Sequence, residues 1–193
     1  MASKIPAFSL RHTPGSEQLE FLRGLEQISP DICRWGIIPF RTVDLALAAA
    51  TQTDTKHLSS DFDFIQDSIF GRVEPLLTDT RVPNQAVFFN IRESGRQFDV
   101  LPDAVPMSVF GGSIGGGGAA SIVESYSGLS GLQQKIPYVY SANTDIRVTW
   151  SLDAILGATW AVLPRVTELF LIGYFVRKDL TVATIDEIKA LNK

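Results

Sequence analysis

The stretch that decides the fold is residues 166–177, VTELFLIGYFVR, which is apolar at nearly every position. A strand with one solvated face alternates apolar and polar residues, whereas a strand covered on both faces is apolar almost throughout. We therefore predict that residues 166–177 form a central strand of a sheet, with protein packed on both of its faces.

Two further strands are predicted just before this one. Leu132–Tyr140 and residues 144–152 are rich in apolar side chains, and Asn143 between them suits a turn. In the second of these segments, alternate apolar side chains share one face: Ile146, Val148 and Trp150. Arg147 and Thr149 fall on the opposite face, which is the pattern of a half-buried strand.

Shorter strands are predicted elsewhere, at residues 42–47, 62–73, 86–92, 96–100, 105–110 and 158–162. The second of these is expected to be bulged near Asp67-Ser68, and Ser94-Gly95 is expected to make a tight turn between the third and the fourth. Residues 51–60 and 75–84 are expected to form turns and loops. The glycine-rich 111–118 is expected to be a mobile loop, because glycine at that density costs entropy and packs poorly.

The two ends of the chain carry helical patterns. Ser16 suits a helix N-cap, Leu19, Leu22 and Leu25 recur at helical spacing, and Pro30 ends the pattern. Residues 184–192 predict a short C-terminal helix. We expect an N-terminal arm with a short helix over residues 1–33, a β-sandwich over 34–180 and a helical tail over 181–193. About eight strands without alternating helices predict an all-β antiparallel sandwich.

Composition excludes several classes of protein. The chain has 193 residues, 45% of them hydrophobic, and a net charge of −4 with acids and bases interspersed. No basic cluster suggests direct binding of nucleic acid, and no apolar run is long enough to span a membrane. Cys33 is the single cysteine, so no internal disulfide is possible, and we interpret it as a small buried hydrophobe. We expect no membrane partner and no nucleic-acid partner.

Residues with catalytic potential are few. Metal sites need clustered histidine and cysteine, but His12, His57 and Cys33 are widely separated. A serine–histidine–aspartate relay would depend on one of those two histidines, and neither lies near a nucleophile elbow. The glycine run lacks the lysine of a phosphate loop. We predict no enzyme activity and no catalytic, cofactor or metal site.

Two other groups of residues have a functional and a structural interpretation. Asp61, Asp63 and Asp67 have the carboxylate chemistry for glycoside hydrolysis or for a calcium site, but a solvated face of a half-exposed strand is the favoured interpretation. Four aromatic side chains fall in or near predicted strands: Tyr138, Tyr140, Trp150 and Trp160. We favour core packing for them over a sugar-binding platform.

Four segments of the chain resemble small structural proteins of tailed-bacteriophage virions, including jelly-roll cement and decoration proteins. They are FNIRESGR at 89–96, VPMSVFG at 105–111, IPYVYSANTDIRV at 136–148 and LFLIGYF at 169–175. The resemblance spans residues 60–177. It implies a single jelly-roll sandwich and a structural, non-enzymatic role in stabilising a capsid.

The resemblance also implies partners and a location. The partners would be copies of the chain itself and other virion proteins, the major capsid protein among them, in a virion assembled in the bacterial host cytoplasm. The arm and the C-terminal helix would then meet neighbouring proteins. Two alternatives stay open, which are a carbohydrate- or receptor-binding jelly-roll module of a phage tail and a single-jelly-roll shell protein.

Overall fold

A computed structural model describes residues 15–43, 51–75, 87–94, 98–100, 104–106, 132–152, 164–181, 183 and 185–191. Several predicted features lie outside these residues. They are the arm before the first helix with His12, most of the strand predicted at 42–47, most of the loop at 75–84, Gly95 of the predicted tight turn, most of the strand predicted at 105–110, the glycine-rich segment at 111–118, the strand at 158–162 and Trp160.

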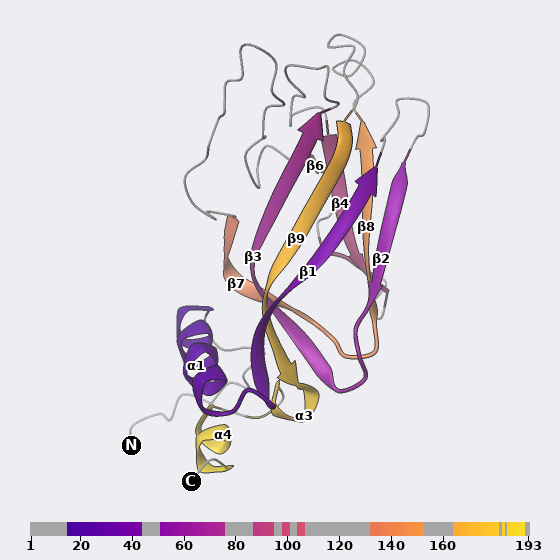
Figure 1. Cartoon of the computed structure of the whole chain (residues 1–193). Coiled ribbons are helices and arrows are strands. Elements are labelled where there is room, and N and C mark those ends of the chain that lie inside the picture. Colours follow the sequence, from indigo (N-terminus) through magenta and orange to yellow (C-terminus); the bar gives the residue numbers. More distant parts are fainter. Residues whose placement is uncertain are drawn as a thin grey trace, which may run out of the picture.

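Two antiparallel sheets form the body of the protein (Figure 1). The front sheet has the order β1-β9-β3-β7, with β1 at Cys33–Val43, β9 at Pro164–Arg177, β3 at Phe62–Pro75 and β7 at Leu132–Tyr140. The back sheet has the order β2-β8-β4-β5, with β2 at Gln52–His57, β8 at Asp145–Leu152, β4 at Val87–Glu93 and β5 at Phe98–Asp99. The short β6 (Val105–Pro106) also pairs with β4. The predicted all-β sandwich is confirmed.

The strands pair in a nested order. β1 pairs with β9, β2 with β8, β3 with β7, and β4 with β5 and β6, all antiparallel. Strands from the beginning of the chain thus pair with strands taken in reverse order from its end, and the pairs nest inward to β4 and β5. Two further pairings, β3 with β9 and β4 with β8, join these ribbons into the two sheets. Each paired ribbon lies within one sheet, and successive ribbons along the chain alternate between the front and the back sheet.

The main core lies between the two sheets. Strand alternation directs every second side chain inward, and β9 lies between β1 and β3 as a central strand, as predicted. The fully buried inward side chains include Phe40, Phe64, Phe89, Tyr140, Ile146, Val148, Trp150, Leu169 and Leu171. The predicted face of Ile146, Val148 and Trp150 is confirmed as the buried face of β8.

A second, smaller core lies on the outer face of the front sheet. Helix α1 (Gly15–Ile28) packs Leu22 and Leu25 there, against outward side chains such as Ile65 and Cys33. Leu180 of α3 (Lys178–Thr181) and Ile188 of α4 (Ile185–Leu191) join the same cluster. The predicted N- and C-terminal helices are confirmed, whereas α3 was not predicted. No described helix is long and apolar enough to cross a bilayer.

The bulge and the turn at Asn143 were predicted correctly, whereas one edge strand was missed. The bulge in β3 lies between Gln66 and Ser68, as expected, and Asn143 has a positive φ of 58° in the turn between β7 and β8. The turn predicted at 51–60 was wrong, because Gln52–His57 is strand β2. Its residues are polar since β2 is an edge strand that is held by backbone pairing to β8 rather than by burial.

Candidate functional site

Two buried carboxylates lie near the turn that joins β7 to β8. Glu93, at the end of β4, is fully buried. Its Oε2 accepts a hydrogen bond from the Tyr138 hydroxyl at 2.8 Å, and its Oε1 accepts one from the Ser141 backbone N–H at 2.8 Å. The Thr144 hydroxyl lies 3.4 Å from the same Oε1. A carboxylate with this many donors is stabilised where it is buried, so Glu93 serves to hold the turn.

The second carboxylate belongs to Asp63, for which the sequence pattern favours a place on a solvated face. That interpretation was wrong, because Asp63 is buried. Its Oδ1 accepts the Ala142 backbone N–H at 2.7 Å, and its Oδ2 accepts the Thr181 hydroxyl. Asp63 therefore ties the turn to α3, and its oxygens are occupied by the protein itself.

The three aspartates considered for chemistry do not converge. Asp61 is exposed at the start of β3, Asp63 is buried under the turn, and Asp67 lies at the bulge. Burial raises the pKa of Asp67, and the nearby Arg23 guanidinium partly offsets that rise. Paired carboxylates for glycoside hydrolysis must face each other across a cleft, and these three do not. Among the described residues, no group of three metal-ligating side chains lies together.

His57 has an acidic partner that the sequence did not indicate. Its Nδ1 lies 2.7 Å from Asp145 Oδ1 on the adjacent strand, and both side chains are exposed. Ser94 Oγ accepts the Asp145 backbone N–H at 3.0 Å. The strand order β2-β8-β4 places Asp145 between His57 and Ser94. A catalytic relay needs the imidazole in the middle, so this arrangement does not activate the serine hydroxyl.

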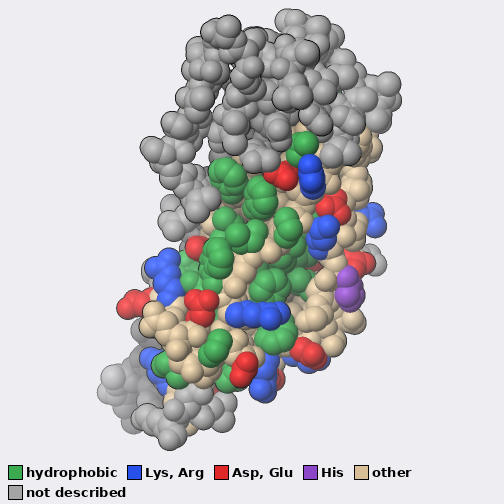
Figure 2. Space-filling view, viewed as in Figure 1, with side chains coloured by type: hydrophobic (Ala, Val, Ile, Leu, Met, Phe, Trp, Pro, Cys, Tyr) green, Lys and Arg blue, Asp and Glu red, His purple; other side chains and the backbone are tan. Residues whose placement is uncertain are grey.

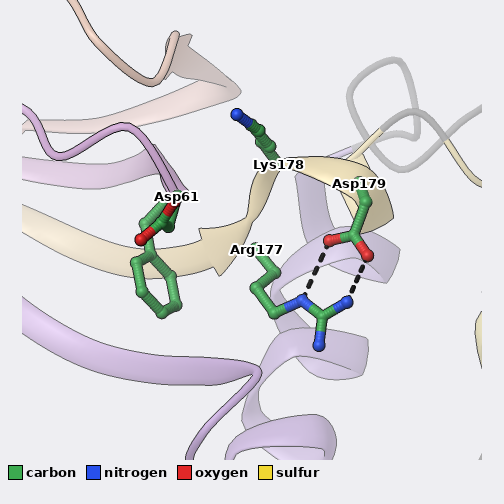
Figure 3. Close-up of a pocket in the computed structure, with 5 residues that line it drawn as sticks. Asp61, Arg177, Lys178 and Asp179 are labelled. Atoms are coloured by element: carbon green, nitrogen blue, oxygen red, sulfur yellow. Dashed lines mark hydrogen bonds and ion pairs between the residues drawn. The ribbon is translucent and has the colours of Figure 1, made fainter.

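A shallow pocket of about 490 Å³ lies where β9 meets α3, lined by Asp61, Phe62, Arg177, Lys178 and Asp179 (Figure 3). Arg177 donates through Nε to Asp179 Oδ1 at 3.0 Å and also pairs with Oδ2. This bidentate pair raises the pKa of Arg177 and lowers that of Asp179. Lys178 points away from the pair, and its backbone N–H donates to the Asp61 carbonyl at 3.0 Å. The pocket is a corner fixed by its own ion pair, with no pair of free acids for catalysis.

The described aromatic residues for which a sugar-binding platform was the alternative interpretation are part of the core. Tyr140 and Trp150 are fully buried between the sheets, and Tyr138 packs against the same core. The Tyr140 hydroxyl donates to Gln66 Oε1 at 2.8 Å, and burial raises the pKa of Tyr140 well above its usual range. Side chains in these positions cannot stack on a sugar without unfolding the sandwich. Core packing is therefore confirmed for these three.

The described surface feature with the clearest functional potential is an apolar patch on the outer face of the front sheet. We define the outer patch as Trp35, Ile37, Pro39, Phe70, Phe170 and Ile172. The three residues of β1 are exposed, Phe70 and Phe170 are half-buried, and Ile172 is buried between them. In the register of the sheet, Trp35 lies beside Tyr174, Ile37 beside Ile172, and Pro39 beside Phe170, which in turn lies beside Phe70. Trp35 is 48% exposed and Ile37 is 43% exposed. Figure 2 shows apolar side chains gathered on this face, over β3, β9 and β1.

Charged side chains border the outer patch at both ends. At one end, Arg41 Nε lies 3.7 Å from Glu168 Oε1. At the other end, α1 supplies Arg23, whose side chain bonds the Tyr174 hydroxyl, and Glu26, which accepts the Trp35 backbone N–H at 2.8 Å. The patch is thus an apolar area framed by opposite charges.

Local sequence pattern indicates this patch only weakly. Strand β1 was not predicted over residues 34–41, because apolar residues there do not alternate cleanly. In the structure, Ile38 and Phe40 face the core, whereas Ile37 and Pro39 face outward. The signal for the outer patch is a pair of adjacent apolar residues, Ile37-Ile38, because one of them must face away from the core. The nearby proline is typical of an edge strand. Cys33, predicted to be buried, is fully buried at the start of β1.

Comparisons with known proteins give little further information. No family model matches the sequence, and no curated protein matches it. Among solved structures, dimeric latent PorU from Porphyromonas gingivalis is similar over 74% of this chain, at 10% sequence identity and a TM-score of 0.26. This chain spans 13% of the PorU chain. A likeness at that level carries no argument about fold or function.

Proposed function

We propose that this chain is a structural, non-enzymatic protein of a bacteriophage virion, which stabilises the capsid through protein–protein contacts. The single observation that carries a role in protein contacts is the outer patch, an exposed apolar area on the sheet face of a well-packed sandwich. Contiguous apolar patches on folded domains commonly mark interaction sites, because exposing them to water costs free energy that a partner recovers.

We also propose that the sandwich is a single jelly roll. Folding a long antiparallel hairpin around itself pairs the first strand with the last, the second with the next to last, and so on inward. The nested order of β1 with β9, β2 with β8, β3 with β7 and β4 with β5 supports this topology. Jelly rolls form the capsid domains of many viruses as well as lectins and cupins, so the topology favours the virion role without requiring it.

The segments that resemble virion proteins fall on structural parts of the sandwich. Residues 136–148 include the end of β7, the turn held by Glu93 and the start of β8. Residues 169–175 are the centre of β9. Turn and core positions keep a fold intact, which supports a shared jelly-roll framework more than a shared ligand.

The carbohydrate-binding alternative has less support. Such a module needs exposed aromatic side chains beside a groove. Tyr140 and Trp150 are buried, and the pocket at Arg177 contributes one aromatic side chain, that of Phe62. Arg34 already covers the Phe62 ring, with its guanidinium carbon 5.2 Å from the ring centroid. A single-jelly-roll shell protein would have the same proposed fold as a cement protein. The following experiment distinguishes these two roles.

The experiment uses particles made from a genome that encodes this chain. Purified particles are quantified for the chain by mass spectrometry, and particles from a null mutant are heated while DNA release is followed. We expect the chain in stoichiometric amounts, and mutant particles that form but release DNA at a lower temperature. Absence of the chain from purified particles would contradict the proposal. A mutant without any particles would indicate a shell protein, and intact particles that fail to adsorb would indicate a receptor-binding module.

A further inference from the structure

We propose that the outer patch is a self-association surface, against which a second copy of this chain packs its own patch, face to face, across a two-fold axis. The proposal deepens the proposed function, on which it rests for its biological setting alone. Its physical basis is a property of the isolated chain, so it is tested without a virion.

The outer face of the front sheet is covered along only part of its length. Near Cys33 and Ile65, α1 forms a third layer over the sheet, with Leu22 fully buried beneath it. Farther along the same strands, α1 no longer covers the sheet, and Ile37 and Trp35 lie in solvent (Figures 1 and 2). A sheet whose two faces are both apolar is typically covered by protein on both faces. Among the residues that the structure describes, no further layer covers this part of the sheet, so another molecule can supply one.

A partner is expected to meet the face of β1 rather than its free edge. The N–H groups of alternate residues point away from β9, and most are already occupied. The Trp35 N–H donates to Glu26 Oε1 at 2.8 Å, and the Arg41 N–H donates to Asp54 Oδ2 at 3.0 Å. Between them, Pro39 has no N–H to donate. At most the Ile37 N–H is left on this stretch, so an added strand would find almost no donors.

The charges around the outer patch favour a copy of the same surface as the occupant. A two-fold contact places identical surfaces against each other, so any net charge would repel its own copy. Here Arg41 is paired with Glu168, and Arg23 lies near Glu26 and Asp67 at the opposite end. Among the described residues, each end thus carries charges of both signs, one base and one acid at the first end and one base and two acids at the second, so a two-fold copy can set the bases of one patch against the acids of the other. The patch is thus electrostatically compatible with itself.

The size of the patch suits the centre of such an interface. The patch spans three adjacent strands, spaced by about 4.8 Å, and at most five residues along a strand at about 3.3 Å each, which gives a footprint of roughly 200 Å². A standard interface buries about 800 Å² on each partner, with an apolar centre and a polar rim. The polar rim would come from the exposed sides of Arg41 and α1. Sheet faces also pack well on each other, at a separation of about 10 Å.

The first test measures the mass of the full-length chain by light scattering and sedimentation velocity. We expect wild type to run as a dimer of twice the 21.2 kDa chain mass. Ile37→Asp places a carboxylate in each half of the contact. We expect it to raise the dissociation constant of the dimer by at least about 100-fold. The matched control is Thr55→Asp, at an exposed position of the edge strand β2 in the back sheet, and it is expected to stay dimeric.

A second readout follows Trp35 itself. Its fluorescence is expected to shift to shorter wavelength and to resist acrylamide quenching as the concentration rises, because dimerisation removes the ring from water. Trp35→Phe is expected to abolish the change. A wild-type chain that stays monomeric at about 100 μM, where contacts of even moderate affinity form, overturns the proposal, as does a dimer that Ile37→Asp leaves intact. A dimer that is absent from purified particles would refute the virion role and leave this proposal standing.

Discussion

The two faces of the front sheet are made by the same strands but differ in how far they are buried. Its inner face packs against the back sheet, with Phe64, Ile69 and Leu171 fully buried. Its outer face is closed by α1 at one end and open at Ile37 at the other. Because strand side chains alternate, one residue along the chain separates a core position from a surface position. Substitutions on the inner face should therefore change folding stability, and substitutions at the open end of the outer face should change association, so the two can be tested separately.

The largest expected effect comes from opening the inner face. Phe64→Ala removes a fully buried ring whose centroid lies 4.9 Å from that of Phe175 and 6.1 Å from that of Tyr140. We expect the free energy of unfolding to fall by about 3–5 kcal/mol, from lost burial and the cavity left behind. Urea denaturation followed by circular dichroism measures it. Phe70→Ala, on the outer face, is the control, and an equal loss there would contradict the comparison of the two faces.

A somewhat smaller effect is expected where α1 closes the outer face. Leu22→Ala shortens a fully buried side chain of α1 and should cost about 2–4 kcal/mol. Since the inner core is untouched, we expect amide exchange to rise first in α1 and only later in β9. Glu20→Ala, on the exposed side of α1, should leave both the stability and the exchange near wild type. Uniform loss of protection across both sheets would show that α1 and the main core unfold together.

A pH-dependent effect is expected at Asp67, next to α1. Burial raises its pKa above the usual 3.8 in the folded chain. The folded state therefore holds the Asp67 proton to higher pH than the unfolded state, and this group lowers stability as the pH rises above 3.8 through the folded pKa. Asp67→Asn removes that penalty. We expect the variant to be more stable than wild type at pH 7, with the difference vanishing near pH 3. Unfolding curves at the two pH values measure it, and an equal difference at both would exclude the explanation.

The smallest effect on folding is expected at the open end of the outer face. Ile37→Ser should change the free energy of unfolding of the dilute chain by less than about 0.5 kcal/mol, because its side chain already contacts water. Ile38→Ser, one residue on, places a hydroxyl in the inner core and should be strongly destabilising. Thermal unfolding of the two variants compares them directly. Similar melting temperatures would show that β1 is not anchored as described.

Reactivity of the single cysteine gives an independent view of the covered end. Burial, together with the Glu26 carboxylate, raises the pKa of the Cys33 thiol to about 12. Thiolate is the reactive form, so labelling with a disulfide reagent at pH 8 should be slow in the folded chain and fast in urea. Leu22→Ala should accelerate it, because the Cys33 thiol lies under α1 with Sγ 3.7 Å from the Leu22 carbonyl oxygen.

Local pattern was sufficient to predict many of the elements. The alternation of Ile146, Val148 and Trp150 identified the buried face of β8, and the apolar run of β9 identified a central strand. Asn143 marked the turn between β7 and β8, where its φ is positive. These features depend on neighbours in the chain, which a sequence displays. Strand β2 was missed because edge position, not composition, makes it a strand.

Partners distant in the chain were not predictable in the same way. Asp63 looked like a solvated acid, yet it accepts hydrogen bonds from Ala142 and Thr181. Glu93 likewise holds a turn some 50 residues further on, and His57 meets Asp145 across two strands. Each pairing exists because strands from the two halves of the chain lie side by side, and no local pattern records which ones do.

The sequence by itself determined that this chain is an all-β protein with a helix near each end, because period and turn residues act over a few positions. The nested pairing of β1 with β9 and β2 with β8 emerged only from the packed sheets, and so did the inward side of strands without a clean alternation, such as β1. The tertiary structure also decided that Ile37 and Phe170 form a patch. The physical reason is that burial is a property of the packed sheets, whereas the sequence specifies only which side chains gain free energy from it.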